Sequence, residues 1–405
     1  MQKITALTAH SILDSRGEWT IEVELATSDS PRYSSGGAGK RHVKASVPHG
    51  KSRGSFESHF VTPNIAVLNV EKVIAPKLKK FDVLRQRDID SFLIELDGTP
   101  MKSRLGANAT LGVSVACLKA GAATKNLPLW KYIKKLAGHS ASKRETKPRL
   151  FANMINGGLH AGNNLRFQEY LVIPKAKTFT EATQNIAKLY KSLKDYLEWS
   201  KGRGATNIGD EGGFAPDFAD GLEPFEILAK AAKNAGLRSK IDFGLDAAAT
   251  DAGLSAAKLT EIYKAMVKRF NLYYLEDPFG ENDFNSFATL RRTLPRHVLV
   301  AGDDLTVTNL ERMEMAHDAG SVNAVIIKPN QIGTVTEALD AVRKAKDWGW
   351  TVVVSHRSGE TNDDFIADFA VGVSADGLKL GAPARGERIA KYNRLLQIER
   401  EERKL

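Results

Sequence analysis

Six apolar runs follow one another at nearly even spacing in the second half of the chain. Each run carries a polar residue at its end: Asp246, Glu276, Asp303, Lys328, His356 and Lys379. Neighbouring residues of this series are 23 to 30 positions apart, which is the length of a strand, a loop and a return helix. The carboxyl ends of all strands in a closed parallel barrel meet at one face. The spacing therefore predicts that the six side chains converge on one pocket.

The first part of the chain has a different pattern. Alternating or β-branched apolar residues predict strands at 4–13, 20–27 and 42–48, and helical periodicity follows at 64–80, 86–96, 106–125 and 128–137. Strands followed by helices without alternation are typical of an α+β cap. From Leu150 onward strands and helices are expected to alternate, and the polar segment 139–149 is the expected linker. We therefore expect a cap at residues 1–138 and a barrel at 139–405.

Composition narrows the class of protein. A chain of 405 residues with 42% hydrophobic residues can bury a large core and is too long for one ordinary domain. No apolar stretch is long enough for a membrane span, and the N-terminus lacks a convincing signal peptide. The single cysteine, Cys117, excludes an intrachain disulfide and is expected to be a small buried hydrophobe. These features predict a cytoplasmic protein without membrane insertion.

The net charge of +10 is compatible with nucleic acid, an anionic membrane surface or a small anionic substrate as partner. Part of the excess is local, in the basic segment between Ser28 and Phe56. Aromatic residues do not interleave with these bases, so a stacking surface for single strands is poorly supported. The simpler interpretation is a solvated basic loop; RNA or another surface partner stays open without support.

Three strand-end acids together suggest a metal site. Taken singly, Asp246, Glu276 or Asp303 would more often be a turn former or a helix cap. Three carboxylates at one barrel mouth repel one another and favour a hard cation such as Mg²⁺, and the absence of histidine among them argues against zinc. Lys328 ends an apolar strand, so its side chain is expected in the mouth, where a nearby dication would lower its pKa and make it a base.

Other polar residues allow two interpretations each. Glu211 in GDEGGFAP is either an incidental acid in a glycine turn or an acid held close to a ligand. Glu169 could equally be a surface acid, and His160 alone is more often structural. Together, the neighbours His356, Arg357 and Ser358 supply an imidazole, a planar guanidinium and a hydroxyl, which suit a phosphate.

Ten stretches in order resemble the enolase family, which dehydrates 2-phosphoglycerate. They run from about residue 12 to 395 and are ILDSRG, LDGT, LGANATLGVSVACLKAGAA, NMINGGLHAGN, GDEGGFAP, LEDPF, GDDLTVTN, IIKPNQIGTVTEAL, SHRSGETNDDFIADFAVG and LKLGAPARGERIAKYN. The resemblance implies an α/β fold, a modified (β/α)8 TIM-type barrel preceded by a small α+β cap domain. It also implies a glycolytic lyase that forms phosphoenolpyruvate, works with two Mg²⁺ ions and assembles as a homodimer or larger homo-oligomer.

The resemblance also implies a role for each matching residue. Lys328 resembles the base that removes the carbon-2 proton, and Glu211 resembles the acid that helps the carbon-3 hydroxyl leave, with Glu169 beside it. Mg²⁺ would stabilise the aci-carboxylate intermediate. The tightly bound Mg²⁺ would be held by Asp246, Glu276 and Asp303, and the second, recruited with substrate, by Ser52. The implied substrate-binding residues are His160, Glu169, His356, Arg357, Ser358 and Lys379.

Two departures from the family pattern leave the catalytic residues in place. The cap loop, usually PSGAST, reads PHGKSR here, which adds Lys51 and Arg53 around Ser52. The segment between Asp246 and Glu276 is shorter than usual, so a surface excursion is expected to be trimmed. Two alternatives stay open beside the dehydratase: an enzyme of the same superfamily acting on another carboxylate, and a protein that binds an anionic partner through its basic surface.

Overall fold

A computed structural model describes residues 2–28, 43–51, 53–138 and 147–403. Its first part is a three-stranded antiparallel sheet of β1 (Ile4–Leu13), β2 (Trp19–Thr27) and β3 (Val43–Ser46), in that order. Apolar residues of β2 such as Ile21, Val23 and Leu25 are buried. The three predicted strands are confirmed, while the basic loop expected between the last two lies mostly outside the described residues.

Helices of the cap cover this sheet. They are α1 (Pro63–Leu68), the π-helical turn η1 (Asn69–Ile74), α2 (Ala75–Leu78), α3 (Gln86–Asp97), α4 (Ala107–Thr124) and α5 (Leu129–Ala137). The helix predicted at 64–80 is interrupted by η1 just before Pro76, which has no N–H for the regular ladder. Helix α4 contacts β2 and β3 on one side and α11 (Pro329–Ile332) and α12 (Val335–Asp347) of the barrel on the other. Small residues let it fit there, and Cys117 is buried in it as expected.

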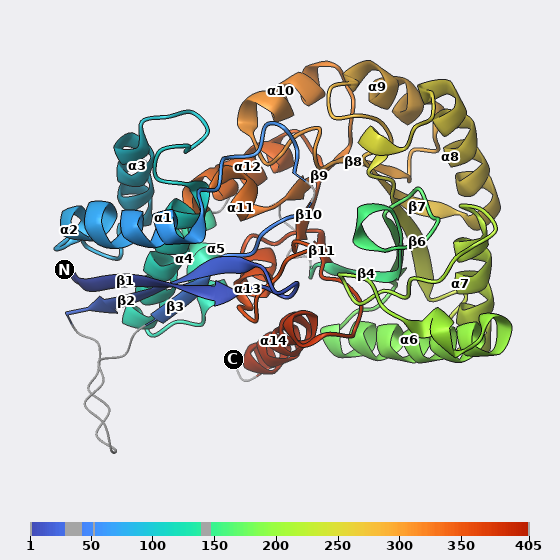
Figure 1. The fold of residues 1–405 in the computed structure, drawn as a ribbon, viewed down its shortest axis with the longest axis horizontal. Helices are drawn as coiled ribbons and strands as arrows, with labels where there is room; N and C mark the ends of the chain where they lie inside the picture. The colour runs from blue at the N-terminus through green and yellow to red at the C-terminus, as the bar shows by residue number, and fades with distance from the viewer. Residues whose placement is uncertain (1, 29–42, 52, 139–146, 404–405) are drawn as a thin grey trace.

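The rest of the described chain forms a closed eight-stranded barrel (Figure 1). Its strands are β4 (Arg149–Asn156), β5 (Glu169–Pro174), β6 (Ile241–Asp246), β7 (Leu272–Glu276), β8 (Leu299–Gly302), β9 (Ala324–Ile327), β10 (Thr351–Ser355) and β11 (Gly377–Lys379). The remaining outer helices are α6 (Phe179–Lys201), α7 (Glu223–Asn234), α8 (Ala256–Phe270), α9 (Phe284–Thr293), α10 (Leu310–Asp318), α13 (Phe365–Gly372) and α14 (Gly386–Arg403). Large side chains such as Phe151, Tyr274 and Ile326 fill the barrel interior, which is therefore a packed core and not a channel. The described helices include none that is both long and apolar enough to cross a membrane.

Strand β5 contradicts the expected all-parallel sheet and the regular alternation from Leu150. It pairs antiparallel with both β4 and β6, and two helices in succession, α6 and α7, follow it. The connection between β4 and β5 holds one short 3-10 turn, η2 (Gly158–His160), and no crossover helix, so it can only return the chain as a hairpin. Because β5 is reversed, its first residue, Glu169, lies opposite Asn156 and Asp246, the last residues of its neighbours.

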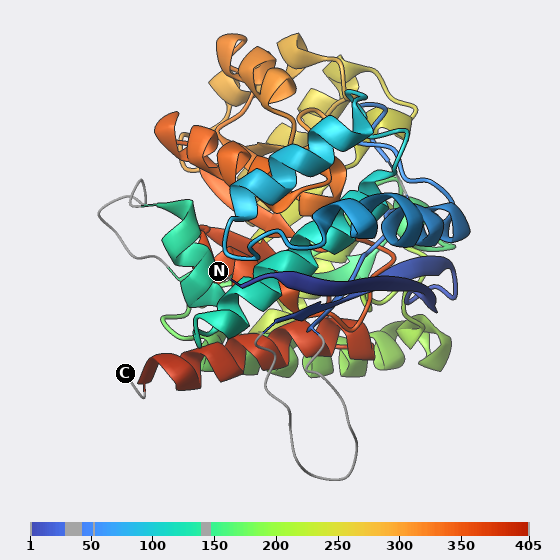
Figure 2. The same ribbon diagram turned by 90° about the vertical axis from the view of Figure 1, so that its left-hand side faces the viewer.

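The cap contacts the barrel at the carboxyl ends of the strands. His49 and Gly359 exchange backbone hydrogen bonds of 2.7 and 2.9 Å, and Ser15 N donates to Glu360 O at 2.7 Å. The Ser15 hydroxyl also accepts from Glu360 N at 3.1 Å, and Arg385, just before α14, donates to Ser15 O. Figures 1 and 2 show α14 beside α6, at the edge of the barrel that faces the cap. These bonds hold the cap against the loop that follows β10 and against the segment just before α14.

Candidate active site

A small pocket lies at the carboxyl ends of the barrel strands. Polar side chains from all eight barrel strands, or from the segments that join them, converge there, and Gly50 of the cap loop lies against them. The lining includes Gly50, His160, Gln168, Glu169, Glu211, Asp246, Asp277, Asp303, Asp304, Lys328, His356, Arg357, Ser358 and Lys379. Glu276 lies beside these residues, within 3.0 Å of Lys379. The structure therefore brings together every sequence-predicted site residue that it describes; Ser52 lies outside the described residues.

Lys379 occupies the centre of an acidic cluster. Its ammonium lies 2.8 Å from Asp246 Oδ2, 2.9 Å from Glu276 Oε1 and 3.1 Å from Glu169 Oε1. Burial opposes the charge on Lys379, yet these carboxylates outweigh it and raise its pKa. Burial and the Asp246 carboxylate raise the pKa of Glu276 to about 8. The protein alone therefore uses one lysine to balance three crowded acids, which is the charge pattern that a divalent cation would satisfy.

Lys328 lies at the end of β9 and contacts Asp303 at the end of β8 through an ion pair. Its backbone N–H donates to Thr308 Oγ1 at 2.9 Å, and Gln331 Nε2 donates to Asp303 Oδ1 at 3.0 Å, so both members of the pair are held in place. Burial lowers the pKa of Lys328, but the Asp303 carboxylate outweighs burial and the net shift is upward. The lowered pKa expected near a dication is thus not a property of the protein by itself.

Glu169 and Glu211 form the acidic side of the pocket with two imidazoles. His160 Nδ1 lies 3.5 Å from Glu211 Oε1 and 3.8 Å from Glu169 Oε1, and Asn153 donates to Glu211 Oε2 at 3.0 Å. Burial and the Glu211 charge raise the pKa of Glu169 well above its usual range. Burial also acts on Glu211, but the His356 and His160 imidazoles outweigh it and hold its pKa low. Environments that push two carboxyl pKa values apart are typical of acid–base pairs.

Arg357 and Ser358, in the stretch that follows β10, are bound by other groups of the protein. Arg357 makes a bidentate ion pair with Glu57 of the cap, at 2.9 and 3.0 Å, and donates to Asn330 Oδ1 at 3.1 Å. Ser358 Oγ accepts from Lys51 N at 2.8 Å. Burial lowers the pKa of His356 to about 4, so the ring is neutral near pH 7. These contacts fix the backbone and side chains that the sequence suggested for anion binding.

Several residues at the site were not found from the sequence. Asp277 accepts hydrogen bonds from the N–H groups of Asp303 and Asp304, at 2.9 and 2.7 Å, and the three form a cluster that could hold a cation. The sequence shows paired acids in LEDPF (Glu276 and Asp277) and in GDDLT (Asp303 and Asp304), but only the first acid of each pair was predicted as a ligand. Glu57 and Arg388 also lie at the site, but no local pattern marks them. Glu57 contacts Arg357, 300 positions away, and Arg388 contacts His356, 32 positions away.

The donor set fits a hard cation. Asp246, Glu276 and Asp303 offer only carboxylate oxygens, and all three are buried. Glu169 also has a buried carboxylate oxygen, Oε2, without a hydrogen-bond partner. Oxygen-only ligands at high negative charge suit Mg²⁺. Of the three predicted ligands, Asp303 also belongs with Asp277 and Asp304 to a group of acids whose oxygens lie close enough to share one ion.

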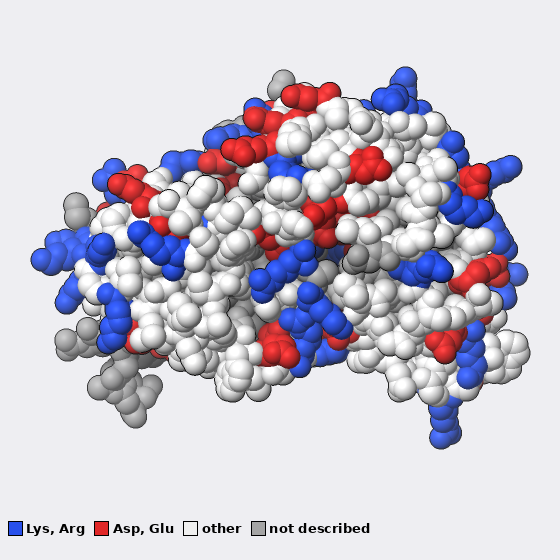
Figure 3. Space-filling view, turned by 45° about the horizontal axis from the view of Figure 1, so that its top comes forward, with Lys and Arg blue, Asp and Glu red and all other residues white. Residues whose placement is uncertain are grey.

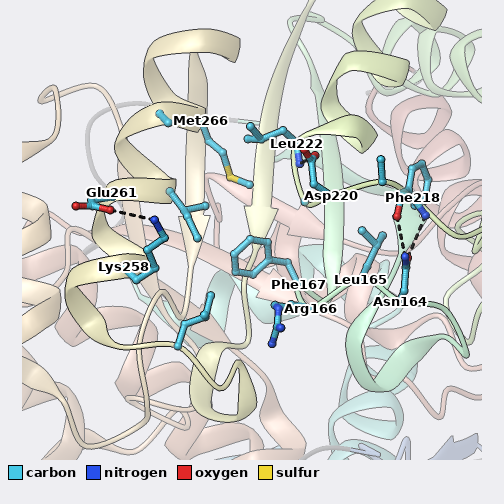
Figure 4. Close-up of a pocket in the computed structure, with 15 residues that line it drawn as sticks. Asn164, Leu165, Arg166, Phe167, Phe218, Asp220, Leu222, Lys258, Glu261 and Met266 are labelled. Carbon is cyan, nitrogen blue, oxygen red and sulfur yellow. Dashed lines mark hydrogen bonds and ion pairs between the residues drawn. The ribbon is translucent and has the colours of Figure 1, made fainter.

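The roomier cavities lie elsewhere. One of about 600 Å³ opens on the barrel exterior between α8 and the segments 164–167 and 218–222 (Figure 4). Phe167, Leu222 and Met266 line it, and its lining includes none of the candidate catalytic residues. In Figure 3, basic and acidic side chains are scattered over a mostly uncharged face, and both kinds lie close together at its centre. Neither feature competes with the strand-end pocket as a site of chemistry.

The fold and the pocket define a class of protein: a capped barrel with buried acids, lysines and histidines gathered at its mouth. Two family models match, the enolase N-terminal domain at residues 4–133 and the enolase C-terminal TIM barrel domain at 145–404. The chain belongs to the enolase family, a family of carbon–oxygen lyases. The predicted fold class is thereby confirmed; the division after residue 138 lies between the two matched ranges and stays a proposal.

Relatives from several organisms are similar over nearly their whole length. The enolase of Thermococcus gammatolerans is 43% identical over 425 residues, covering 98% of this chain and 95% of the relative. The enolase of Methanopyrus kandleri is 42% identical, with 98% and 96% covered. That of Methanocaldococcus jannaschii is 41% identical over 421 residues, with 98% and 95% covered.

Proposed function

We propose that this chain catalyses the reversible dehydration of 2-phospho-D-glycerate to phosphoenolpyruvate and water. One observation carries the proposal. Lys328 follows β9 and Glu169 begins β5, and these two strands lie on opposite sides of the closed barrel. A base and an acid pair therefore face the same pocket from opposite walls, which suits removal of a proton from one face of a substrate and of a hydroxyl from the other.

The cation site completes the proposal. Asp246, Glu276 and Asp303 would hold one Mg²⁺, and Ser52 would join a second ion that arrives with substrate. When bound, Mg²⁺ supplies Lewis-acid stabilisation of the negative charge that builds up on the substrate carboxylate. Lys379 already lies against two of these acids and would present its positive charge to the substrate from the same side.

Lys328 is the proposed base for the first step. Its ammonium lies in the pocket, is almost fully buried and is held by Asp303. To act as a base it must first give up its proton, which burial favours and the Asp303 contact opposes. The neutral amine would then take the proton from carbon 2, leaving the electron pair on the substrate.

Glu211 and Glu169 are proposed to serve the second step. The carbon-3 hydroxyl is a poor leaving group and needs a proton as the carbon–oxygen bond breaks. Glu169 has the raised pKa of the pair and can store that proton, while Glu211 is held by Asn153 and faces His160 and His356. Proton donation through Glu211 would release water, and substrate anions would be bound by His160, Glu169, His356, Arg357, Ser358 and Lys379.

Two variants separate the proposed steps. Lys328→Ala should abolish exchange of the carbon-2 proton with solvent deuterium, because it removes the base. Glu211→Gln should keep this exchange while losing dehydration, because its role comes later. Lys346→Ala is the matched control, since Lys346 is a partly buried lysine bound to the carbonyls of Val373 and Ser374, away from the pocket.

The assay is the absorbance of phosphoenolpyruvate, with and without Mg²⁺ and with chelator. Wild-type protein without any Mg²⁺-dependent turnover of 2-phosphoglycerate would refute the proposed function. Equal loss of exchange in both catalytic variants, with folding intact, would refute the division of labour. Turnover of other carboxylates in place of 2-phosphoglycerate would favour the alternative superfamily activity.

We also propose that the chain assembles as a homodimer or a larger homo-oligomer. Leu13 and Trp19 are cross-strand neighbours at the end of the β1–β2 ribbon, and they are 55% and 61% exposed. Adjacent exposed apolar side chains of this size are typical of interaction surfaces. Light scattering of the wild-type chain and of a Trp19→Ser variant would test this; a monomeric wild type would refute it.

A further inference from the structure

Arg388 is a fully buried cation that the proposed mechanism does not use. It lies on the first turn of α14 and is 0% exposed. Its Nη1 donates to His356 Nδ1 at 2.7 Å and to Arg357 O at 2.6 Å. Its Nη2 donates to Ser358 O at 2.6 Å and to Asp210 O at 3.2 Å. All four hydrogens of the two terminal nitrogens thus point at acceptors in the two loops that carry His356 and Glu211.

The contact with His356 has a consequence for the imidazole. A guanidinium is always protonated and offers only donors. The ring nitrogen that faces it, Nδ1, must therefore present a lone pair, because two donors cannot face each other at 2.7 Å. A neutral imidazole with a lone pair on Nδ1 carries its hydrogen on Nε2. Arg388 thereby selects one of the two tautomers of His356.

The selected tautomer directs a donor into the pocket. His356 Nε2 lies 3.4 Å from Glu211 Oε2 and is a buried atom without a close hydrogen-bond partner. With the hydrogen on Nε2, the ring points an N–H at Glu211 and at any substrate oxygen between them. With the hydrogen on Nδ1, the ring would present a lone pair to a carboxylate, which repels it.

We propose that Arg388 is a positioning residue that fixes His356 in the Nε2–H tautomer and holds the Asp210–Glu211 turn against it. This deepens the proposed dehydratase function and rests on it, because His356 matters there as a donor beside Glu211. Lysine could not replace Arg388 fully, since one ammonium nitrogen cannot serve the acceptors of two separate guanidinium nitrogens.

The tautomer can be measured without substrate. In protein labelled with ¹⁵N only at histidine, the His356 signals are assigned by their loss in His356→Asn. In the wild type, Nε2 should give the signal of a protonated ring nitrogen and Nδ1 that of an unprotonated one. Arg388→Met removes the donor and leaves only Glu211 to favour Nε2–H, so a share of the Nδ1–H tautomer should appear beside it, and the ring should protonate at a pH above that of the wild type. Arg388→Gln is the second variant if Arg388→Met does not fold, because its amide oxygen can accept a hydrogen from Nδ1.

Kinetics separate positioning from general stability. Arg388→Met should lower kcat by about 100-fold with a much smaller change in KM, as expected when a group is misplaced at an assembled site. Arg388→Lys keeps the charge and one donor nitrogen and should stay within about tenfold of wild type. In a His356→Asn background, Arg388→Met should cost little further rate, because its effect acts through His356. Arg394→Met is the control: Arg394 lies on the same helix and pairs with Asp368 and Glu401.

The outcomes are distinct. A single Nε2–H tautomer that persists in Arg388→Met and Arg388→Gln would overturn the inference, even if their activity fell. Rate losses in Arg394→Met equal to those in Arg388→Met would overturn it as well. Absence of wild-type turnover would refute the dehydratase function and leave the tautomer measurement intact, so the two failures can be told apart.

Discussion

Gly50 has no room for a side chain, and a single methyl group there should disable Arg357. A Cβ at this position would lie 1.9 Å from Arg357 Nη2 and 2.5 Å from its Cζ. An ordinary contact is ~3.5 Å, so Gly50→Ala forces the guanidinium to move by roughly 1.5 Å. The guanidinium cannot move freely, because it is buried and bound to Glu57 and Asn330.

The cost follows from these bonds. A hydrogen bond to a charged group contributes about 1.5–3 kcal/mol, and a buried ion pair that loses its geometry costs about 3–5 kcal/mol. Since the pair can adjust partly, Gly50→Ala should lower the free energy of unfolding by about 2–4 kcal/mol. Displacement of Arg357 by more than 1 Å should also lower kcat/KM by about 100-fold.

Urea unfolding and the phosphoenolpyruvate assay measure the two effects. Gly204→Ala is the matched control, because a Cβ there would meet nothing within 4 Å; it should change stability by less than about 0.5 kcal/mol. If Gly50→Ala unfolds at the wild-type urea concentration and keeps wild-type kcat/KM, the close packing of Gly50 against Arg357 does not constrain the site and the reasoning fails.

Three further changes test other parts of the site. Asp303→Asn should raise the Mg²⁺ needed for half-maximal activity at least about tenfold, because one of three charged ligands is lost; an unchanged Mg²⁺ titration would contradict the metal assignment. In the cap loop, Lys51 lies 3.3 Å from Asp210, so its charge is close to the pocket. The proposed substrate is an anion that this charge would attract, so Lys51→Ala combined with Arg53→Thr should lower kcat/KM at low salt and make kcat/KM less dependent on salt. A reduced Mg²⁺ requirement would show instead that the loop charges oppose the second ion. Burial, followed by the charges of Arg53, Arg16 and Arg357, lowers the pKa of His49 to about 4. The unfolded chain therefore binds a proton before the folded one does, and stability present above about pH 6.5 should be lost as the pH falls toward 4. His49→Phe, which keeps the stacking on Phe60, should flatten this acid limb in urea unfolding, and an unaltered limb would exclude His49 as its source.

The sequence alone could predict which polar residues lie at the strand ends, because evenly spaced apolar runs mark the strands and each run ends in a polar residue. Apolar runs mark buried strands, and a polar residue that ends such a run must leave the core at the mouth of a barrel. Asp246, Glu276, Lys328 and His356 were found in this way, and the cap strands by their alternation. The family resemblance then supplied Glu169, Glu211 and His160, which the spacing alone did not single out.

The reversal of β5 could not be predicted from local pattern. Its residues EYLVIP are buried on both faces, and such a run reads the same in either direction. Glu169 begins this strand, so a search for polar residues at strand ends passes over it. The ion pair between Glu57 and Arg357 joins residues 300 positions apart, and the contact of Arg388 with His356 depends on how α14 packs. Neither has a periodic signal.

The contacts of Ser15 and Arg388 set a limit on when the pocket can be completed during synthesis. Ser15 leaves the ribosome among the first residues, yet its partners Ser358 and Glu360 and the neighbouring Arg385 are made last. Domains fold as they emerge, N-terminal first, so the cap can form early. His356 cannot contact the guanidinium of Arg388 until α14 has left the ribosome. A nascent chain halted before Gly386 would contain all eight strands of the barrel, but its pocket would lack the contact between Arg388 and His356.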